Sequence, residues 1–217
     1  MRPSTIALCL SLFATGGCAI LRAPSPPLGT SVTIEPETPS DGAEWRTIAR
    51  AADQQRIDAI DARWHAAIAA LPHSLQPRTA ADRQLLDPEA ARPLVALPPG
   101  GYECRRIRLG GRAKLTRFKP DTCYVKLDGN KLSYTTQTGR LMPGGWLYPD
   151  SDTRQVLLAT DRPTGVQVAP AYGVEATRDL IGVIERLGPL RWRLTIPRDD
   201  ELDVWEITPW PKQKLED

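Results

Sequence analysis

Residues 122–136 read TCYVKLDGNKLSYTT, and this stretch decides the fold because it predicts a β-hairpin. Two runs rich in β-branched and aromatic residues, Thr122–Leu127 and Lys131–Thr136, flank the turn sequence Asp128-Gly129-Asn130. An Asp-Gly pair between such runs is a strong hairpin signal, since both residues tolerate the backbone angles of a tight turn. Alternation along the first strand predicts which side chains face inward, namely Cys123, Val125 and Leu127.

The same texture of short strands and turns continues on both sides of this hairpin. Roughly nine short strands follow one another with no helical stretch between them. This order predicts an antiparallel meander, either a barrel or a sandwich. We favour a small closed or nearly closed barrel, because closure removes exposed strand edges. The other predicted strands are Tyr102–Leu109, Lys114–Phe118, Trp146–Tyr148, Gln155–Thr160, Val166–Ala169, Asp179–Leu187, Leu190–Ile196 and Leu202–Thr208.

The strand Leu190–Ile196 has the most regular alternation in the chain. Its apolar residues Leu190, Trp192, Leu194 and Ile196 alternate with Arg191, Arg193 and Thr195. A period of two with one apolar and one polar side predicts one buried face and one face in water.

Helical spacing precedes the strands, over residues 41–97. Apolar residues at three- and four-residue steps run from Trp45 to Leu71, and Pro72 ends the pattern. Thr79 and Asp82 provide a cap for a second, shorter helix that reaches Leu86. We therefore predict an α+β fold, in which an N-terminal helical hairpin packs on the antiparallel β domain of residues 98–210. The apolar stripe is expected to be a core face, and a partner-binding face is the alternative.

The N-terminus has the layout of an export signal. Arg2 precedes the apolar run Ile6–Ala14, which is too short to span a bilayer, and small residues follow from Thr15 up to Cys18. This layout resembles a bacterial lipobox, in which the cysteine becomes the lipidated first residue of the mature protein. The alternatives are an ordinary secretory signal and a cytoplasmic protein. We expect residues 1–17 to be the signal peptide and Cys18 to carry the lipid.

A proline-rich stretch follows the expected lipidation site. Residues 18–40 contain five prolines and no hydrophobic period, which predicts a lipid anchor with a stiff, solvated tether. Residues 211–217 are expected to be a C-terminal tail. The formal net charge is only +2, so it gives no general attraction to nucleic acid.

Four cysteines occur, and two of them remain for the folded part. Cys9 lies in the expected signal and Cys18 is the expected lipid site, which leaves Cys104 and Cys123. In an oxidising compartment, two thiols on neighbouring strands are expected to form a disulfide. A two-cysteine metal site is the alternative, but there is no C-x-x-C spacing and both histidines are far off in sequence. We expect no metal and no cofactor.

The chain has no recognisable catalytic motif. There is no G-x-S-x-G, P-loop, H-E-x-x-H or dinucleotide-binding sequence, and we assign no catalytic residue. An enzyme would require a cleft where several of the charged residues from different strands converge with shifted pKa values. The residues considered for that cleft are Asp121, Asp150, Asp179, Glu185 and Arg186.

A basic stretch is the strongest candidate for contact with an anionic surface. Residues 105–119 hold seven cationic residues and no acidic one. Such a patch can meet the phosphate groups of a lipid. The alternative is that these charges coat the solvated face and the tips of two strands. The candidate residues are Arg105, Arg106, Arg108, Arg112, Lys114 and Arg117.

A set of residues and segments along the chain carries a resemblance to a known family. In the helical part these residues are Trp45, Asp53, Arg56, Asp61 and Trp64. In the β part the segments are residues 101–105, 107–110, 123–125, 137–139, 145–150, 178–182, 185–194 and 202–204. Over about residues 41–210 the chain thus resembles a bacterial family known only as domain of unknown function 4893. The resemblance implies no activity, cofactor or catalytic residue.

These observations predict an uncharacterised bacterial envelope lipoprotein. It is expected to face the periplasm, with the outer membrane favoured over the inner one. Its expected role is non-catalytic binding or interaction, with the membrane reached through the N-terminal lipid and another envelope protein or a lipid as partner. The alternatives are a lipocalin-like carrier of an apolar small molecule and an envelope hydrolase.

Overall fold

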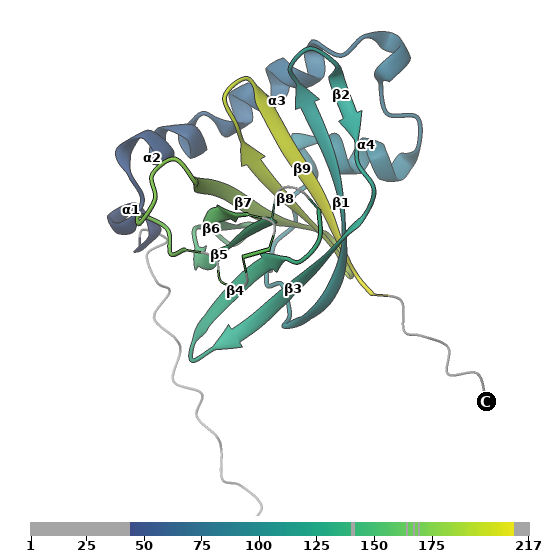
Figure 1. Ribbon diagram of the computed structural model, residues 1–217. Coiled ribbons are helices and arrows are strands. Elements are labelled where there is room, and N and C mark those ends of the chain that lie inside the picture. The colour runs from purple at the N-terminus through teal and green to yellow at the C-terminus, as the bar shows by residue number, and fades with distance from the viewer. Residues whose placement is uncertain (1–43, 140–141, 164, 167, 169, 211–217) are drawn as a thin grey trace, which may run out of the picture. The chain divides into compact units, whose positions relative to one another are not determined.

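The computed structural model describes residues 44–139, 142–163, 165–166, 168 and 170–210, and nine antiparallel strands form one sheet in this part of the chain (Figure 1). Neighbours in sequence are neighbours in the sheet from β3 to β9, which is the predicted meander. The predicted turn 128–130 joins β3 to β4, and β4 has the predicted bounds. The strands are β1 (Gly100–Gly110), β2 (Lys114–Arg117), β3 (Asp121–Asp128), β4 (Lys131–Thr136), β5 (Met142–Pro149), β6 (Arg154–Arg162), β7 (Asp179–Gly188), β8 (Arg191–Pro197) and β9 (Glu201–Pro209).

Pairing between β1 and β9 closes the sheet into an eight-stranded barrel, which confirms the barrel over the sandwich. Residues 102–110 of β1 pair with residues 201–209 of β9. The other edge of β1 is shared, because residues 100–104 pair with β3 and residues 107–110 pair with β2. The strand β2 therefore lies beside the closed circle and is not one of its eight members.

The barrel interior is filled by side chains. One cluster of buried residues includes Tyr102, Tyr134, Trp192 and Trp205, together with aliphatic residues from the strands around the circle. Val95 and Leu97, which precede β1, belong to the same cluster. An eight-stranded barrel has an interior just wide enough for its own side chains to fill, and here large aromatic rings fill it.

The helical segment divides into α1 (Glu44–Ile48), α2 (Ala51–Asp58), α3 (Ile60–Ala69) and α4 (Ala80–Leu86), with short 3₁₀ turns at His73–Leu75 and Pro88–Ala90. The prediction of one helix from Trp45 to Leu71 is therefore wrong. Arg50 has extended backbone angles, and its N–H donates to the Tyr172 hydroxyl at 3.1 Å instead of to a helical carbonyl. The predicted cap of α4 is confirmed, since Asp82 N–H donates to Thr79 Oγ1. None of the described helices has the length and apolar character needed to cross a membrane.

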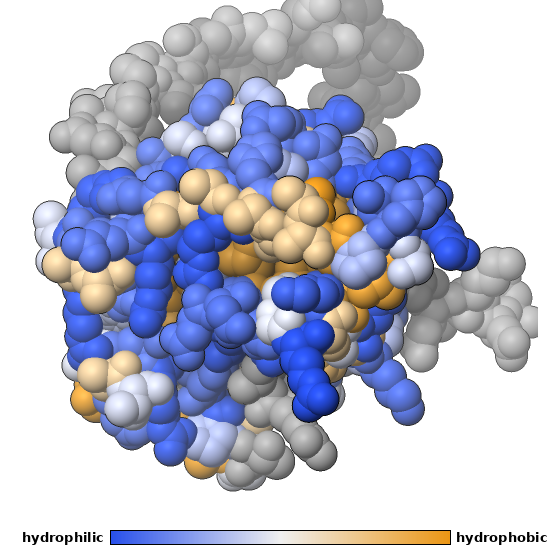
Figure 2. Space-filling view, turned by 90° about the horizontal axis from the view of Figure 1, so that it is seen from above, coloured by the Kyte–Doolittle hydropathy of each residue, from blue (hydrophilic) through white to orange (hydrophobic). Residues whose placement is uncertain are grey.

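Both tryptophans of the helical segment pack on the outer face of the barrel, so the stripe is a core face. Trp45 joins a buried cluster with residues of β5, β6 and β7, and its indole N–H donates to Asp150 Oδ1 at 2.8 Å. Trp64 joins a second cluster with residues of β1 and β9, and its N–H donates to the Leu86 carbonyl at 3.0 Å. Viewed from above, weakly apolar residues form a pale band with strongly apolar residues beside it and hydrophilic residues around them (Figure 2).

The strand β8 is buried on both faces, which corrects the prediction of one wet face. Arg193 and Thr195 have no exposed surface, whereas Leu190 lies outside the strand and is 66% exposed. The reason is that the end of α4 and the residues after it cover this side of the barrel. Arg193 donates to the carbonyls of Leu85, Asp87 and Pro88. Alternation in a sequence marks two faces, but it does not show whether other parts of the chain cover the polar one.

Two smaller expectations are also wrong. The described residues 166 and 168 of the predicted strand Val166–Ala169 are not in a strand, and β6 pairs directly with β7. The residues between β6 and β7 therefore form a long connection. Leu127 is 59% exposed instead of inward-facing, because it lies at the tip of the β3–β4 hairpin, whereas Cys123 and Val125 are buried as predicted.

Candidate functional site

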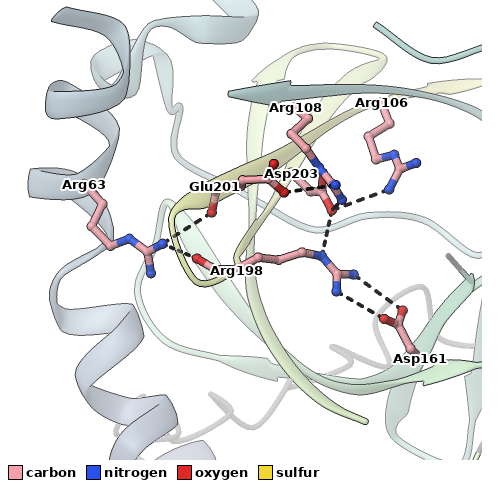
Figure 3. Close-up of polar contacts among 7 residues, drawn as sticks. All are labelled: Arg63, Arg106, Arg108, Asp161, Arg198, Glu201 and Asp203. Atoms are coloured by element: carbon pink, nitrogen blue, oxygen red, sulfur yellow. Dashed lines mark hydrogen bonds and ion pairs between the residues drawn. The ribbon is translucent and has the colours of Figure 1, made fainter. Parts of the chain in front are cut away.

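Charged side chains gather inside one end of the barrel, which we call the charged end. Arg106 and Arg108 of β1, Asp161 of β6 and Asp203 of β9 lie on the inward face of their strands, and Arg198 follows β8 (Figure 3). The alternation of side chains places them there, because they are two or four residues from buried interior residues such as Cys104, Ala159, Trp205 and Ile196. We call Arg63, Arg106, Arg108, Arg198, Asp161, Glu201 and Asp203 the arginine cluster.

Asp203 is the centre of the arginine cluster. Its carboxylate is fully buried and accepts from Arg108 Nε at 2.7 Å, from Arg108 Nη2 at 2.9 Å and from Arg198 Nε at 2.7 Å. Burial disfavours the charged carboxylate, but the Arg108 hydrogen bond and the charges of Arg106, Arg198 and Arg108 outweigh it, so the pKa of Asp203 lies below its ordinary value. The carboxylate is therefore held in its ionised form.

Further ion pairs hold the arginines around Asp203 in place. Arg198 Nη1 lies 3.2 Å from Asp161 Oδ2, and Arg108 Nη1 lies 2.9 Å from Glu201 Oε2. Arg63 of α3 donates to the backbone carbonyls of Arg198 and Glu201, which fixes the β8–β9 connection against the helix (Figure 3). Arg108 and Arg198 are thus each paired with two carboxylates.

Arg106 differs from the other arginines because it is poorly paired. It is 6% exposed, its nearest ionic contact is Nη1 to Asp203 Oδ2 at 3.5 Å, and its Nε is buried without a hydrogen-bond partner. The guanidinium lies 3.8 Å from the Phe118 ring centre and 5.1 Å from that of Trp205. Burial lowers the pKa of Arg106 from its ordinary value. The side chain is held by two aromatic rings while much of its hydrogen-bonding capacity is unused.

Two pockets adjoin the arginine cluster at the β8–β9 connection. One has a volume of about 380 Å³ and is lined by residues that include Arg56, Asp179, Arg198 and Asp200. The other, of about 360 Å³, lies between α3 and the β1–β2 turn and shares Asp199, Asp200 and Glu201 with the first. Carboxylates outnumber arginines around the first pocket, and Arg106 is not among the residues that line either pocket.

The structure divides the basic stretch that the sequence singled out. Arg106 and Arg108 point into the barrel, whereas Arg105 and Arg117 point outward, toward Asp82 of α4. Arg105 Nη2 lies 2.8 Å from Asp82 and 2.7 Å from Glu206, so it is paired on the outer face. Arg112 and Lys114 are exposed at the β1–β2 turn. The six residues therefore lie on two faces and a turn.

The predicted disulfide between Cys104 and Cys123 is confirmed. The bridge links β1 to β3 inside the barrel, with a Cα–Cα distance of 6.1 Å, and both residues are fully buried. The Tyr134 hydroxyl lies 3.1 Å from the sulfur of Cys123 and 3.5 Å from that of Cys104. The two sulfur atoms of the disulfide are thus part of the packed interior. Cys18, the expected lipid site, lies outside the described residues.

The five residues considered for a catalytic cleft do not meet one another in the described part of the chain. Asp150 binds Trp45 and Arg154, Asp179 binds Arg50, and Glu185 binds Arg193. Arg186 donates to backbone carbonyls, including that of Gly188, and Asp121 accepts from Thr138. Each is committed to a different structural contact. Among the described residues, no three His, Cys, Asp or Glu side chains are grouped to hold a metal ion.

Sequence reasoning missed five members of the arginine cluster, namely Arg63, Asp161, Arg198, Glu201 and Asp203. Asp203 lies 97 positions after Arg106 and 95 positions after Arg108, so no local pattern connects it to them. One signal was available, because Arg106 and Arg108 share a strand face with Cys104 while Arg105 does not. That alternation indicates that at least two of the basic residues point inward.

Residues that carry the family resemblance in the helical segment make structural ties to the barrel. Besides the contacts of Trp45 and Trp64, Asp53 is buried, accepts from the Tyr172 hydroxyl at 2.5 Å and pairs with Arg56 at 2.7 Å. Burial and the Asp53 hydrogen bond raise the pKa of Tyr172 to about 12, so the hydroxyl keeps its proton for that contact. These residues fix α2 to the β6–β7 connection.

Comparison with family models finds a match for this chain. A family model described as "Domain of unknown function (DUF4893)" matches residues 45–207, which is more than half of the chain and contains the barrel and its helices. No curated protein matches the chain.

Proposed function

The chain belongs to the DUF4893 family, and since that family's description names no activity, we propose from the residues themselves that this protein is a bacterial envelope lipoprotein with a non-catalytic binding role. In this proposal the lipid on Cys18 anchors the chain, residues 19–40 act as a tether, and the barrel binds another envelope protein. The family assignment confirms the resemblance predicted from the sequence. The location and the partner are proposals.

The filled interior of the barrel is the observation that carries the binding role. A carrier of an apolar small molecule needs a hollow interior lined by apolar side chains. Here Trp192, Trp205, Tyr102 and Tyr134 occupy that space with the disulfide. A filled barrel offers its outer surface and its two ends for binding, which favours docking of a partner over the lipocalin-like alternative. The catalytic alternative is disfavoured because its five candidate residues are held apart by other contacts.

Exposed apolar residues at the end opposite the arginine cluster support docking of a protein. Leu94 precedes β1, Leu127 lies near the β3–β4 turn, Leu190 lies in the β7–β8 turn and Trp210 follows β9. The strand order places the β3–β4 turn, the β7–β8 turn and the end of β9 at the same end of the barrel, which we call the apolar end. Arg186, near the end of β7, donates to the Leu94 carbonyl at 3.4 Å, which places Leu94 at this end as well. All four are exposed, Leu94 by 75%. Clusters of exposed apolar residues mark interaction sites more often than single ones do.

Replacement of Cys18 with serine is expected to abolish lipidation. In cells fed a palmitate analogue, the wild-type chain should incorporate the label and move to the membrane fraction, because the thiol at the first mature position carries the acyl group. The variant should remain unlabelled. Cys9→Ser, which lies in the expected signal, serves as the control and should be labelled like the wild type. Equal labelling of the Cys18 variant would contradict the proposed anchor.

Binding at the apolar end is tested by native mass spectrometry of protein extracted from its own membrane. We expect a stoichiometric protein partner with the wild type and its loss in a Leu94→Glu/Leu190→Glu variant, because two charges there oppose desolvation of the interface. Val174→Glu is the matched control, since Val174 is 70% exposed but lies in the β6–β7 connection at the other end. A bound lipid in place of a protein would favour the carrier alternative. Equal binding by all three chains would overturn docking at the apolar end.

A further inference from the structure

We propose that Arg106 is an oxyanion-binding residue, which takes a carboxylate or phosphate group at the charged end of the barrel. The inference rests on the proposed binding role and names the chemistry of one ligand group. It depends on three features of Arg106, namely its unused hydrogen-bonding edge, the balance of charge around it and the two aromatic rings that hold it.

The unused edge of the guanidinium is the first feature. Nη1 faces Asp203 at 3.5 Å, and Nε is buried without a partner. Among the described residues, Arg106 Nη2 also makes no hydrogen bond to a protein atom, and the close-up shows this side of the group turned away from Asp203 (Figure 3). Nε and Nη2 form the side of a guanidinium that binds two oxygens of one carboxylate or phosphate at once. A buried N–H without a partner is costly, and an oxyanion would satisfy it.

The balance of charge is the second feature. Asp203 already accepts three hydrogen bonds from Arg108 and Arg198, and Asp161 and Glu201 each have an arginine partner. The arginine cluster contains four arginines and three carboxylates, and Arg106 is the member with the longest ionic contact. The Asp121 carboxylate, which is outside the cluster, also attracts Arg106. A buried cation that is not fully paired attracts an anion more strongly than an exposed one, because water screens it less.

The aromatic rings are the third feature. Phe118 lies against the guanidinium at 3.8 Å and Trp205 at 5.1 Å, and Phe118 N–H also donates to the Arg106 carbonyl at 3.0 Å. Stacking holds the flat group in one plane without using its N–H donors. The side chain is therefore oriented before a ligand arrives, so that less rotational freedom is lost on binding. Phe118 is partly exposed and lies in the β2–β3 connection, so one of the two rings against Arg106 borders solvent.

The test is a titration of the full-length protein with inorganic phosphate and, separately, with succinate, at constant ionic strength. Calorimetry measures the dissociation constant, and the Nε–Hε cross-peak of Arg106 in an NMR spectrum reports contact with the anion. We expect saturable binding of at least one of the two anions with a shift of that cross-peak. Arg106→Gln should weaken binding about tenfold or more, because it removes a charged, two-point contact.

Two further variants separate recognition from folding. Arg105→Gln is the matched control, because Arg105 is adjacent in sequence but points outward to Asp82 and Glu206, and it should bind like the wild type. Arg106→Lys keeps the charge but loses the two-point edge, so it should bind more weakly than the wild type even if Arg106→Gln does not fold. Tighter binding of phosphate than of succinate would assign the group to a phosphate-bearing ligand, and the reverse to a carboxylate.

The proposal is overturned if neither anion binds the wild type, or if Arg106→Gln or Arg106→Lys binds as well as Arg105→Gln. That failure is distinguishable from failure of the proposed function. If the wild type binds a protein partner and the Leu94→Glu/Leu190→Glu variant does not, the proposed binding role is supported even when the oxyanion site is rejected.

Discussion

Replacing Glu185 with glutamine is expected to lower the free energy of unfolding by about 3–5 kcal/mol, because it leaves a buried arginine without its counter-charge. Arg193 has no exposed surface, and its Nε and Nη2 lie 2.9 and 2.7 Å from Glu185 Oε2. Nη1 of Arg193 donates to the carbonyls of Leu85 at the end of α4 and of Asp87 just after it, and the Trp64 ring lies 4.3 Å from the guanidinium. The pair therefore joins β7, β8 and the helical segment at one point.

Urea denaturation followed by tryptophan fluorescence measures this effect. Asp58→Asn is the control, because the Asp58–Arg46 pair has a similar distance of 2.8 Å but both partners are exposed, and its loss should cost less than about 1 kcal/mol. The double variant Glu185→Leu/Arg193→Met should be less destabilised than Glu185→Gln, since it removes both charges and keeps side-chain volume. Equal stability of Glu185→Gln and Asp58→Asn would show that Arg193 does not depend on its partner.

Removal of the Cys104–Cys123 disulfide has the second largest expected effect, a loss of roughly 3 kcal/mol. The bridge joins residues 19 positions apart, so it restricts the unfolded chain, and both sulfurs are buried in the barrel. The variant Cys104→Ala/Cys123→Ala should unfold at a lower urea concentration than the oxidised wild type.

A reducing agent provides the control for this measurement. The disulfide is first reduced in strong denaturant, and the urea transition is then measured with reductant present. The wild-type transition should move to a lower urea concentration, while that of the double alanine variant should not change. If the wild-type transition is the same with and without reductant, the bridge contributes nothing measurable to stability.

The parts of the fold that depend on local pattern could be predicted from the sequence. The hairpin at residues 122–136, the cap at Thr79 and the barrel arrangement all rest on neighbouring residues or on regular strand spacing. The break at Arg50 could not be predicted, because it depends on the Tyr172 hydroxyl, 122 positions away. The buried face of β8 depends likewise on contacts between Arg193 and residues more than 100 positions earlier.

The candidate site shows the same division. Arg106 and Arg108 were found as members of a basic stretch, because a cluster of like charge is visible in sequence. Their inward direction follows from strand alternation. Their pairing with Asp203 follows from the closure of the barrel between β1 and β9, which no local pattern encodes. A charge run in a strand is therefore better interpreted after its residues are divided by face.

Closure by the first and last strands also bears on how the chain is made. On the ribosome, β1 emerges about a hundred residues before β9, and until then the growing sheet has no partner for that edge. Pairing of such distant segments is slow, and open strand edges invite aggregation. The nascent chain therefore completes its fold only after β9 has been synthesised, and a product truncated before Glu201 would keep both edges open.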